Sequence, residues 1–340
     1  MMDRVDRRRV PTYSLGNRRP RWFATKMQIG GVLRVFLPGI LLSLAINGCS
    51  QPIKPPVAPT SLLPGITATD TPIALHITPT ESPTGVPPSP NPTEATCSLA
   101  DGQIIQSEIE HPLLSRALPF RVYLPPCYEE QPDDDYPALY LLHGLQGTDA
   151  QWDELGIDET ADALIGRGVL PPFLIIMPWQ RTGIDIETAV PDVLIPHIDQ
   201  VFRTRSEPEW RAIGGLSKGA GQAMRIALTH PEMFSVLGLH SPATLYSDGL
   251  ILQWLLAIPE DERPDVMIDI GDKDSLLPST QNLINLFSQI DFEVLTRINP
   301  GDHTSAYWSA HIASYLNWYA DHWTSASLLE AWKLEQIIDE

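Results

Sequence analysis

The sequence predicts an α/β fold in which a mostly parallel central sheet is flanked by helices, with little or no lid. Between residues 120 and 320, short apolar runs typical of strands alternate with helical patterns. The segment from Ser241 to Pro264 is too short for a large lid, which favours an open pocket. The expected strands lie near 120–124, 138–143, 173–177, 211–215, 235–239, 266–270 and 293–298.

The strand expected at 138–143 leads into a loop that contains two glycines. Its apolar residues, Ala138–Leu142, are followed by His143 and then by Gly144–Gly147. Glycines let this loop bend inward, so that the backbone N–H of Leu145 could stabilise a developing negative charge. His143 is interpreted as a turn residue that supports the loop, with no direct chemical role.

The stretch Gly215–Gly219 has the G-x-S-x-G pattern of a serine nucleophile on a sharp strand-to-helix turn. Such a turn strains the backbone of Ser217 and presents its hydroxyl above the sheet, while the glycines avoid Cβ clashes. The N–H of Lys218 opens the following helix and points toward the site. A glycine-rich turn that contains a serine by chance is the alternative. One apolar face marks the helix: Ala220, Ala223, Met224, Ala227 and Leu228.

A candidate acid follows the strand expected at 266–270. The apolar run Asp265–Gly271 is followed by Asp272 and Asp274. Both residues lie just past the C-terminal end of a strand, where the binding sites of open α/β sheets are found. Asp274 is the preferred acid and Asp272 is the alternative. Asp269 lies inside the strand and is expected to be structural.

The candidate base follows the last expected strand. Phe292–Ile298 reads as a strand and leads to the Pro300–Gly301 turn and His303. Serine, aspartate and histidine therefore occur in the chain order known for serine nucleophiles on a strand-to-helix turn. This order favours a catalytic role for Ser217, Asp274 and His303.

The chain resembles the esterase family of α/β-hydrolases, which includes feruloyl esterases, enterochelin esterases, S-formylglutathione hydrolases and the mycobacterial mycolyltransferases. Eight segments carry the resemblance in family order from about residue 100 to 320, and together they make it specific. They are Val122–Pro126, Leu141–Gly144 with Trp152, Ile195–Asp199, Gly214–Ser217, His230–Phe234, Ser241–Pro242, Gly271–Asp274, and Pro300–His303 with Trp308.

The resemblance implies that Ser217 is the nucleophile, Asp274 the acid and His303 the base. It also implies that the backbone N–H groups of Leu145 and Lys218 hold the oxyanion. The family usually has a neutral residue such as methionine where this chain has Lys218, so its side chain is either solvated or selects the charge of the substrate. Four residues could line an open pocket: Trp152, Trp179, Arg181 and Trp308.

The N-terminus has the features of a signal peptide. The first 34 residues are basic and precede Val35–Ile46, an apolar run too short for a bilayer span of roughly 20 residues. Ile46–Cys49 resembles a bacterial lipobox, in which Cys49 becomes a lipidated mature N-terminus. We therefore expect residues 1–49 to be a signal peptide and the protein to be extracytoplasmic and lipid-anchored to the cell membrane. Ordinary secretion, an uncleaved anchor and a start at Met27 are the alternatives.

A proline-rich segment separates this anchor from the catalytic domain. Residues 50–96 contain twelve prolines, nine threonines and no aromatic residue, a composition that cannot bury a core. We expect an extended disordered linker with a reach of up to about 140 Å. The esterase domain is then expected at 97–323 and a C-terminal helical tail at 324–340.

Two cysteines remain besides Cys49. Cys97 and Cys127 stand near the start of the expected domain, and in an exported protein they would form one disulfide. Two buried free thiols are the alternative. Neither cysteine belongs to a histidine motif, so a catalytic cysteine is not expected.

The charge is unevenly distributed. Residues 1–49 carry a net charge of +7 and the remainder carries −26, which disfavours nucleic-acid binding. The sequence has no Walker A motif, G-x-G-x-x-G motif or zinc-spaced cluster, so no cofactor or metal is expected. The expected partners are an ester substrate, either a small molecule or polysaccharide-linked, and a membrane reached through the lipid anchor.

The sequence as a whole predicts an exported serine esterase that forms an acyl-enzyme through Ser217, His303 and Asp274. An acyltransferase would use the same mechanism with an alcohol as acceptor. Two further hypotheses compete with this interpretation: a non-catalytic module that binds the envelope or a glycan, and a metal-assisted hydrolase.

Overall fold

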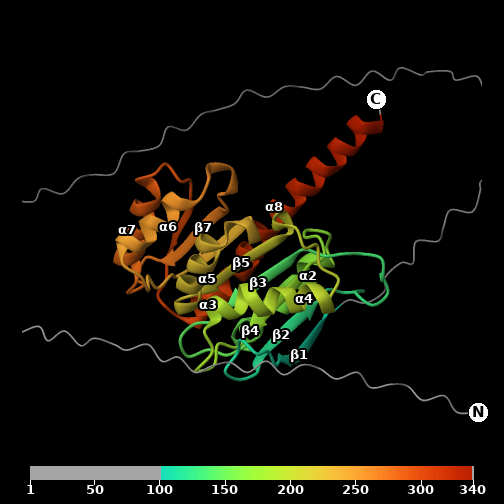
Figure 1. Cartoon of the computed structure of the whole chain (residues 1–340), viewed down its shortest axis with the longest axis horizontal. Helices are drawn as coiled ribbons and strands as arrows, with labels where there is room; N and C mark the ends of the chain where they lie inside the picture. Colours follow the sequence, from blue (N-terminus) through green and yellow to red (C-terminus); the bar gives the residue numbers. More distant parts are fainter. Residues whose placement is uncertain (1–100, 339–340) are drawn as a thin grey trace, which may run out of the picture. The chain divides into compact units, whose positions relative to one another are not determined.

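The computed structural model describes residues 101–338 of the chain, and the side chains of residues 101–327. One sheet contains the strands β1 (Gln103–Ile109), β2 (Leu118–Leu124), β3 (Ala138–Leu142), β4 (Leu174–Pro178), β5 (Arg211–Leu216), β6 (Val236–His240), β7 (Asp265–Gly271) and β8 (Leu295–Asn299). Their order in space is β1-β2-β4-β3-β5-β6-β7-β8 (Figure 1). Strand β2 is antiparallel to both neighbours, and every other pair is parallel. The predicted mostly parallel sheet is confirmed.

All seven expected strands are present within a few residues of their predicted limits. Strands β3, β4, β5 and β6 are buried along their whole length, because helices cover both faces of a parallel sheet. The sequence did not predict β1. Most of its side chains are exposed or half-buried, so it lacks the apolar pattern by which a strand is recognised.

Helices cover both faces of the sheet. On one face, helices α3 to α7 pack against strand residues such as Tyr140 and Leu142. On the other, α1, α2 and α8 pack against the alternate residues Leu139 and Leu141, because successive side chains of a strand point to opposite faces. The helices are α1 (Gln151–Glu154), α2 (Ile157–Ile165), α3 (Ile186–Ala189), α4 (Ile195–Val201), α5 (Lys218–Thr229), α6 (Asp248–Ala257), α7 (Leu277–Ser288) and α8 (Ser305–Ile338).

Short helical turns lie between the longer helices and strands. A π-helical turn at Val190–Leu194 joins α3 to α4, and 3₁₀ turns occupy Pro208–Trp210, Pro231–Met233 and Glu260–Glu262. The segment from Ser241 to Pro264 holds α6 and the last of these turns. Helix α6 buries Ile251 and Leu255 in the core, so it is part of the domain wall. This agrees with the expected small or absent lid.

Helix α8 crosses the boundary that the sequence suggested between domain and tail. It continues without a break from Ser305 to Ile338, and its C-terminal end extends past the sheet (Figure 1). The expected limit at 323/324 therefore falls inside one helix. Tyr315, Tyr319 and Trp323 of this helix are buried against the sheet.

Several predictions fall on the undescribed N-terminal part. The signal peptide at 1–49 with Cys49, the linker at 50–96, and Cys97 all lie outside the described residues. Cys127 lies inside them and is disulfide-bonded. Within residues 101–338, no helix is both long enough and apolar enough to cross a bilayer.

Candidate functional site

Ser217 occupies the sharp turn between β5 and α5. Its backbone has φ 55° and ψ −118°, a strained conformation for a residue with a Cβ. The turn is held because the N–H of Ser217 donates to the carbonyl of His240, at 2.9 Å. A Cβ on Gly215 would lie 2.5 Å from the carbonyl carbon of Gly219, so this turn requires glycine there. The local geometry predicted from the G-x-S-x-G pattern is thus present.

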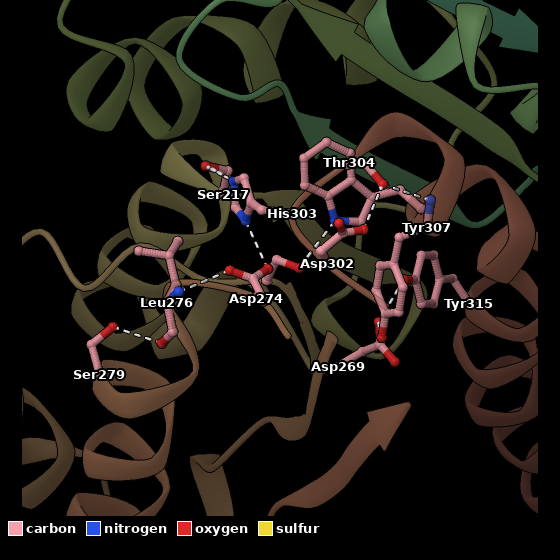
Figure 2. A network of polar contacts seen from close by, with 12 residues as sticks. Ser217, Asp269, Asp274, Leu276, Ser279, Asp302, His303, Thr304, Tyr307 and Tyr315 are labelled. Carbon is pink, nitrogen blue, oxygen red and sulfur yellow. Dashed lines mark hydrogen bonds and ion pairs between the residues drawn. The ribbon is translucent and has the colours of Figure 1, made fainter. Parts of the chain in front are cut away.

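A continuous series of hydrogen bonds joins Ser217, His303 and Asp274 (Figure 2). His303 Nδ1 lies 2.7 Å from Asp274 Oδ2, and His303 Nε2 lies 2.9 Å from Ser217 Oγ. An ionised carboxylate only accepts, so Nδ1 carries the imidazole proton and donates it. Nε2 is then free to accept from the serine hydroxyl. The sequence predicted these three residues, and the fold brings them together from segments far apart in the chain.

Asp274 is fixed in place by its own loop. Its side chain is buried, and its Oδ1 accepts a hydrogen bond from the backbone N–H of Leu276 at 2.8 Å. Its backbone N–H donates to the carbonyl of Gly271 at 3.2 Å. Both carboxylate oxygens therefore have partners, which leaves one orientation for the group that faces His303.

Asp272, the alternative acid, has a different surrounding. Its side chain is exposed, and its Oδ1 accepts from the backbone N–H of Gly301 at 3.0 Å. That contact ties the loop after β7 to the loop that carries His303. Asp272 thus contacts the backbone of the histidine loop, whereas Asp274 contacts the imidazole itself.

The two expected oxyanion donors belong to segments in close contact. A Cβ on Gly219 would lie 2.4 Å from the carbonyl oxygen of Leu142, so the start of α5 packs directly on the end of β3. Leu145 follows that strand end in a turn closed by a 3.1 Å hydrogen bond from Gly147 N–H to Gly144 O. Lys218 is the first residue of α5, where backbone N–H groups lack acceptors one turn earlier.

The side chain of Lys218 is half-buried. Burial lowers the pKa of its ammonium group from the ordinary value, and the nearby Glu187 opposes that shift. The structure therefore places a partly desolvated cation directly after the serine.

His143 connects two loops beside the site. Its Nε2 accepts from the backbone N–H of Gln180 at 2.9 Å, while its Nδ1 lies 2.7 Å from the carbonyl of Gly144. Burial lowers the pKa of the imidazole, which keeps the ring neutral, with Nδ1 as donor and Nε2 as acceptor. This is the supporting position expected from the sequence.

Of the four expected pocket residues, Trp152 and Trp308 are buried, and Trp179 and Arg181 are partly exposed. Trp152 is 1% exposed, packs against His240 and donates from its Nε1 to the carbonyl of Leu142 at 3.1 Å. We therefore reassign Trp152 from the pocket to the core. Trp179 and Arg181 are half-buried, and the guanidinium of Arg181 lies 4.5 Å from the ring centre of Trp179, a cation–π contact.

Trp308 is buried, yet its ring touches the site. It meets the ring of His303 edge-on, with 4.9 Å between the ring centres. Its Nε1 donates to the hydroxyl of buried Ser241 at 3.1 Å. Trp308 thus forms a wall against the imidazole and has little surface left for a ligand.

A cavity of 740 Å³ lies away from these residues. It opens at the N-terminal ends of the parallel strands and is lined by Tyr136, Pro171, Trp210 and several acidic residues. The triad lies beyond the opposite ends of the strands. Among the side chains described, those of residues 101–327, no group of three or more His, Cys, Asp or Glu could hold a metal.

His240, at the end of β6, is a buried histidine that the sequence reasoning did not single out. It is 0% exposed, its Nε2 lies 3.1 Å from the hydroxyl of Tyr319, and its ring lies over that of Tyr315. Burial, with smaller contributions from Arg297 and His311, lowers the pKa of His240 from 6.5 to about 3. The folded protein therefore keeps this ring neutral.

The neutral state of His240 predicts a loss of stability in acid. The unfolded chain takes up the proton near pH 6.5 and the folded chain only near pH 3, so stability falls as the pH drops through that window. Between pH 7 and pH 5, protonation of this histidine in the unfolded chain should lower the free energy of unfolding by about 2 kcal/mol. Urea unfolding of the parent and of His240→Gln at both pH values measures the difference. Equal pH dependence in the two proteins would contradict this assignment.

Comparison with known proteins agrees with this architecture. A family described as "Putative esterase" matches residues 112–321. Within the chain, 139 residues are 34% identical to an endo-1,4-beta-xylanase/feruloyl esterase of Xylanibacter ruminicola; they cover 36% of this chain and 19% of that protein. Another 34% identity, over 137 residues, links it to Esterase Rv1288 of Mycobacterium tuberculosis, covering 35% and 28%. The chain thus matches less than a third of the length of these relatives.

Solved structures show the same fold. A ferulic acid esterase superposes with a TM-score of 0.60 at 21% identity, over 65% of this chain and 98% of that one. An S-formylglutathione hydrolase from Staphylococcus aureus superposes with a TM-score of 0.53 at 20% identity, over 64% and 98%. The sheet and its neighbours define an α/β-hydrolase fold. Since the family match spans most of the described residues, the chain belongs to this esterase family.

Proposed function

We propose that the protein is a serine carboxylic-ester hydrolase in which Ser217, His303 and Asp274 form the catalytic triad. The observation that carries the proposal is the hydrogen-bonded series from the serine hydroxyl through the imidazole to the buried carboxylate. A nucleophile, a base within hydrogen-bond reach and a group that orients the base are the parts that acyl transfer requires.

The first half of the reaction acylates the enzyme. His303 Nε2 takes the proton of Ser217 as Oγ bonds to the ester carbonyl carbon, and the carbonyl oxygen becomes an oxyanion. The N–H groups of Leu145 and Lys218 are proposed to hold this oxyanion. The bond to the alcohol oxygen then breaks, and the imidazolium gives its proton to the departing alcohol.

Water completes the cycle. His303 removes a proton from a water molecule as the water oxygen attacks the acyl carbon, and the second oxyanion occupies the same position. When the bond to Ser217 Oγ breaks, the imidazolium returns the proton to that oxygen and the acid leaves. Asp274 keeps the imidazole in the required tautomer and stabilises its charged form throughout.

For the substrate, we propose phenolic-acid esters, including those linked to polysaccharides. The support is the similarity to an endo-1,4-beta-xylanase/feruloyl esterase, the small lid segment, and the partly exposed Trp179 and Arg181, which follow the C-terminal end of β4 at the same edge of the sheet as the triad. Aromatic surface of this kind suits a planar acyl group.

A kinetic experiment tests the proposed reaction. Aryl acetate, methyl ferulate, a feruloylated arabinoxylan fragment and a thioester are offered to the full chain. We expect an initial burst of alcohol or phenol, equal to the amount of enzyme, whenever deacylation is slow. Turnover should survive a metal chelator. Binding of the glycan without any ester cleavage would instead indicate a non-catalytic module, and loss of activity on chelation would indicate a metal-assisted hydrolase.

We further propose that the protein is exported and held at the cell membrane by a lipid on Cys49. The sequence supports this with the basic start, the apolar run and the lipobox-like Ile46–Cys49. The disulfide-bonded state of Cys127 is in keeping with an oxidising compartment. The proline-rich stretch at 50–96 would hold the catalytic domain away from the membrane.

Removing the anchor should change where the protein is found without changing its catalysis. Cys49→Ser should shift the protein from the detergent phase to the aqueous phase in a phase-partition experiment. A chain that starts at Thr96 should also be aqueous and should keep the parent kcat, because every proposed catalytic group lies beyond residue 140. A folded but inactive truncated chain would mean that residues before 96 contribute to the site.

A further inference from the structure

A buried carboxylate lies behind the proposed triad. Asp269, near the C-terminal end of β7, is 0% exposed. In the register of the sheet it stands between His240 of β6 and Arg297 of β8. A carboxylate in this position is costly unless hydrogen bonds satisfy both oxygens.

Three side chains supply those hydrogen bonds, and Figure 2 shows the two tyrosines among them. Asp269 Oδ1 accepts from the hydroxyl of Tyr307 at 3.0 Å and from the hydroxyl of Tyr315 at 2.5 Å. Asp269 Oδ2 accepts from the side-chain amide of Asn299 at 2.8 Å. Burial and the nearby Asp269 raise the pKa of both phenols, so the tyrosines keep their protons and donate. Burial also raises the pKa of Asp269, while its donors oppose that shift.

Two of the three donors flank His303 in the sequence. Asn299 is the last residue of β8, Tyr307 is the third residue of α8, and the loop that carries His303 runs between them. The aromatic ring of Tyr307 also packs on this loop, since a Cβ on Gly301 would lie 2.4 Å from its Cδ2. Asp269 therefore accepts hydrogen bonds from residues at both ends of the loop. Tyr315, two turns further along α8, anchors the helix and does not border the loop.

We propose that Asp269 is a positioning residue: through Asn299 and Tyr307 it fixes the loop so that His303 stays within hydrogen-bond reach of Ser217. The inference rests on the proposed triad. Its physical basis is that two donors at opposite ends of a short loop share one immobile acceptor, so a shift of either end breaks a buried hydrogen bond. Small displacements of a general base reduce the rate strongly.

The two tyrosines provide a matched test. Tyr307→Phe and Tyr315→Phe each remove one hydroxyl donor from the same oxygen of Asp269. Both should lower the unfolding free energy by a similar amount. Tyr307→Phe should reduce kcat by about 10- to 100-fold with little change in KM. Tyr315→Phe should keep kcat within about twofold of the parent, because its hydroxyl does not border the loop.

Exchanging the side chains of Asn299 and Asp269 gives a second test that does not depend on either tyrosine. Asn299→Asp places a second carboxylate against Asp269 Oδ2, and the repulsion should displace the loop. Adding Asp269→Asn restores one donor facing one acceptor and keeps the total charge. The double variant should therefore recover most of the kcat that the single variant loses. A proton NMR signal from His303 Nδ1–H, strongly deshielded in the parent, should weaken in Asn299→Asp and return in the double variant.

Equal kcat losses in Tyr307→Phe and Tyr315→Phe would overturn the inference, because they would indicate a general packing role. Unchanged kcat in both would overturn it as well, as would a double variant no better than Asn299→Asp. The proposed function is tested separately by whether the parent depends on Ser217. If Ser217 proves dispensable, the triad itself fails, whatever the tyrosine variants do.

Discussion

Ser217→Ala is expected to reduce hydrolysis of a simple aryl ester by about 10³-fold or more while leaving the fold intact. The substitution removes the nucleophilic oxygen that lies 2.9 Å from His303 Nε2. It retains a Cβ in the same strained backbone conformation, so the turn itself should persist. The residual rate reflects substrate binding and the oxyanion donors, which the substitution does not touch.

The measurement is steady-state kcat/KM together with urea unfolding of parent and variant. Ser247→Ala is a suitable control, because Ser247 is exposed and its side chain makes no capping hydrogen bond at the start of α6. That control should match the parent in both rate and stability. Activity of Ser217→Ala near the parent level would mean that another residue attacks the ester.

Asp274→Asn is expected to lower kcat by about 10²- to 10⁴-fold. In the parent protein, the Asp274 carboxylate accepts a hydrogen bond from Nδ1–H of His303 at 2.7 Å. An asparagine in the same place can turn its amide toward the ring and donate, which favours the tautomer with Nδ1 unprotonated. Nε2 would then carry the proton and could not remove the one on Ser217.

Asp272→Asn is the matched comparison for the acid. Asp272 lies two residues away on the same loop, but its exposed side chain accepts from a backbone N–H, which an asparagine oxygen can also do. Its kcat should stay within about threefold of the parent. The reverse ranking of the two variants would move the acid from Asp274 to Asp272.

Much of this architecture can be read from local sequence. The strands β3 to β7 are mostly apolar, and the G-x-S-x-G turn has steric requirements that only a few residues meet. Because the carboxyl ends of parallel strands lie at one edge of the sheet, Asp274 and His303 could be placed beside Ser217 without knowing the full topology. The residues alone left Asp272 as an alternative, and the resemblance to the esterase family favoured Asp274 as the acid.

Other features depend on contacts between distant segments and leave no local pattern. Trp152 follows the loop of His143 in sequence, yet its burial depends on how α1 packs against β6 and α8. Asp269 looks like an isolated polar residue in an apolar strand until α8 brings Tyr307 and Tyr315 over it. Strand β1 is recognised as a strand by its pairing with β2, since its own side chains are mostly exposed.

The most direct test of the central claim is the site of covalent labelling by a fluorophosphonate. The reagent forms a stable bond to a serine oxygen activated by an adjacent base, so it reports the Ser217–His303 pair without assuming any natural substrate. The labelled full-length protein is digested and the modified peptide is sequenced by mass spectrometry. We predict one equivalent of label, on Ser217, with strongly slowed labelling in Asp274→Asn. Label on a different residue, or an unlabelled protein that still hydrolyses esters, would contradict the account.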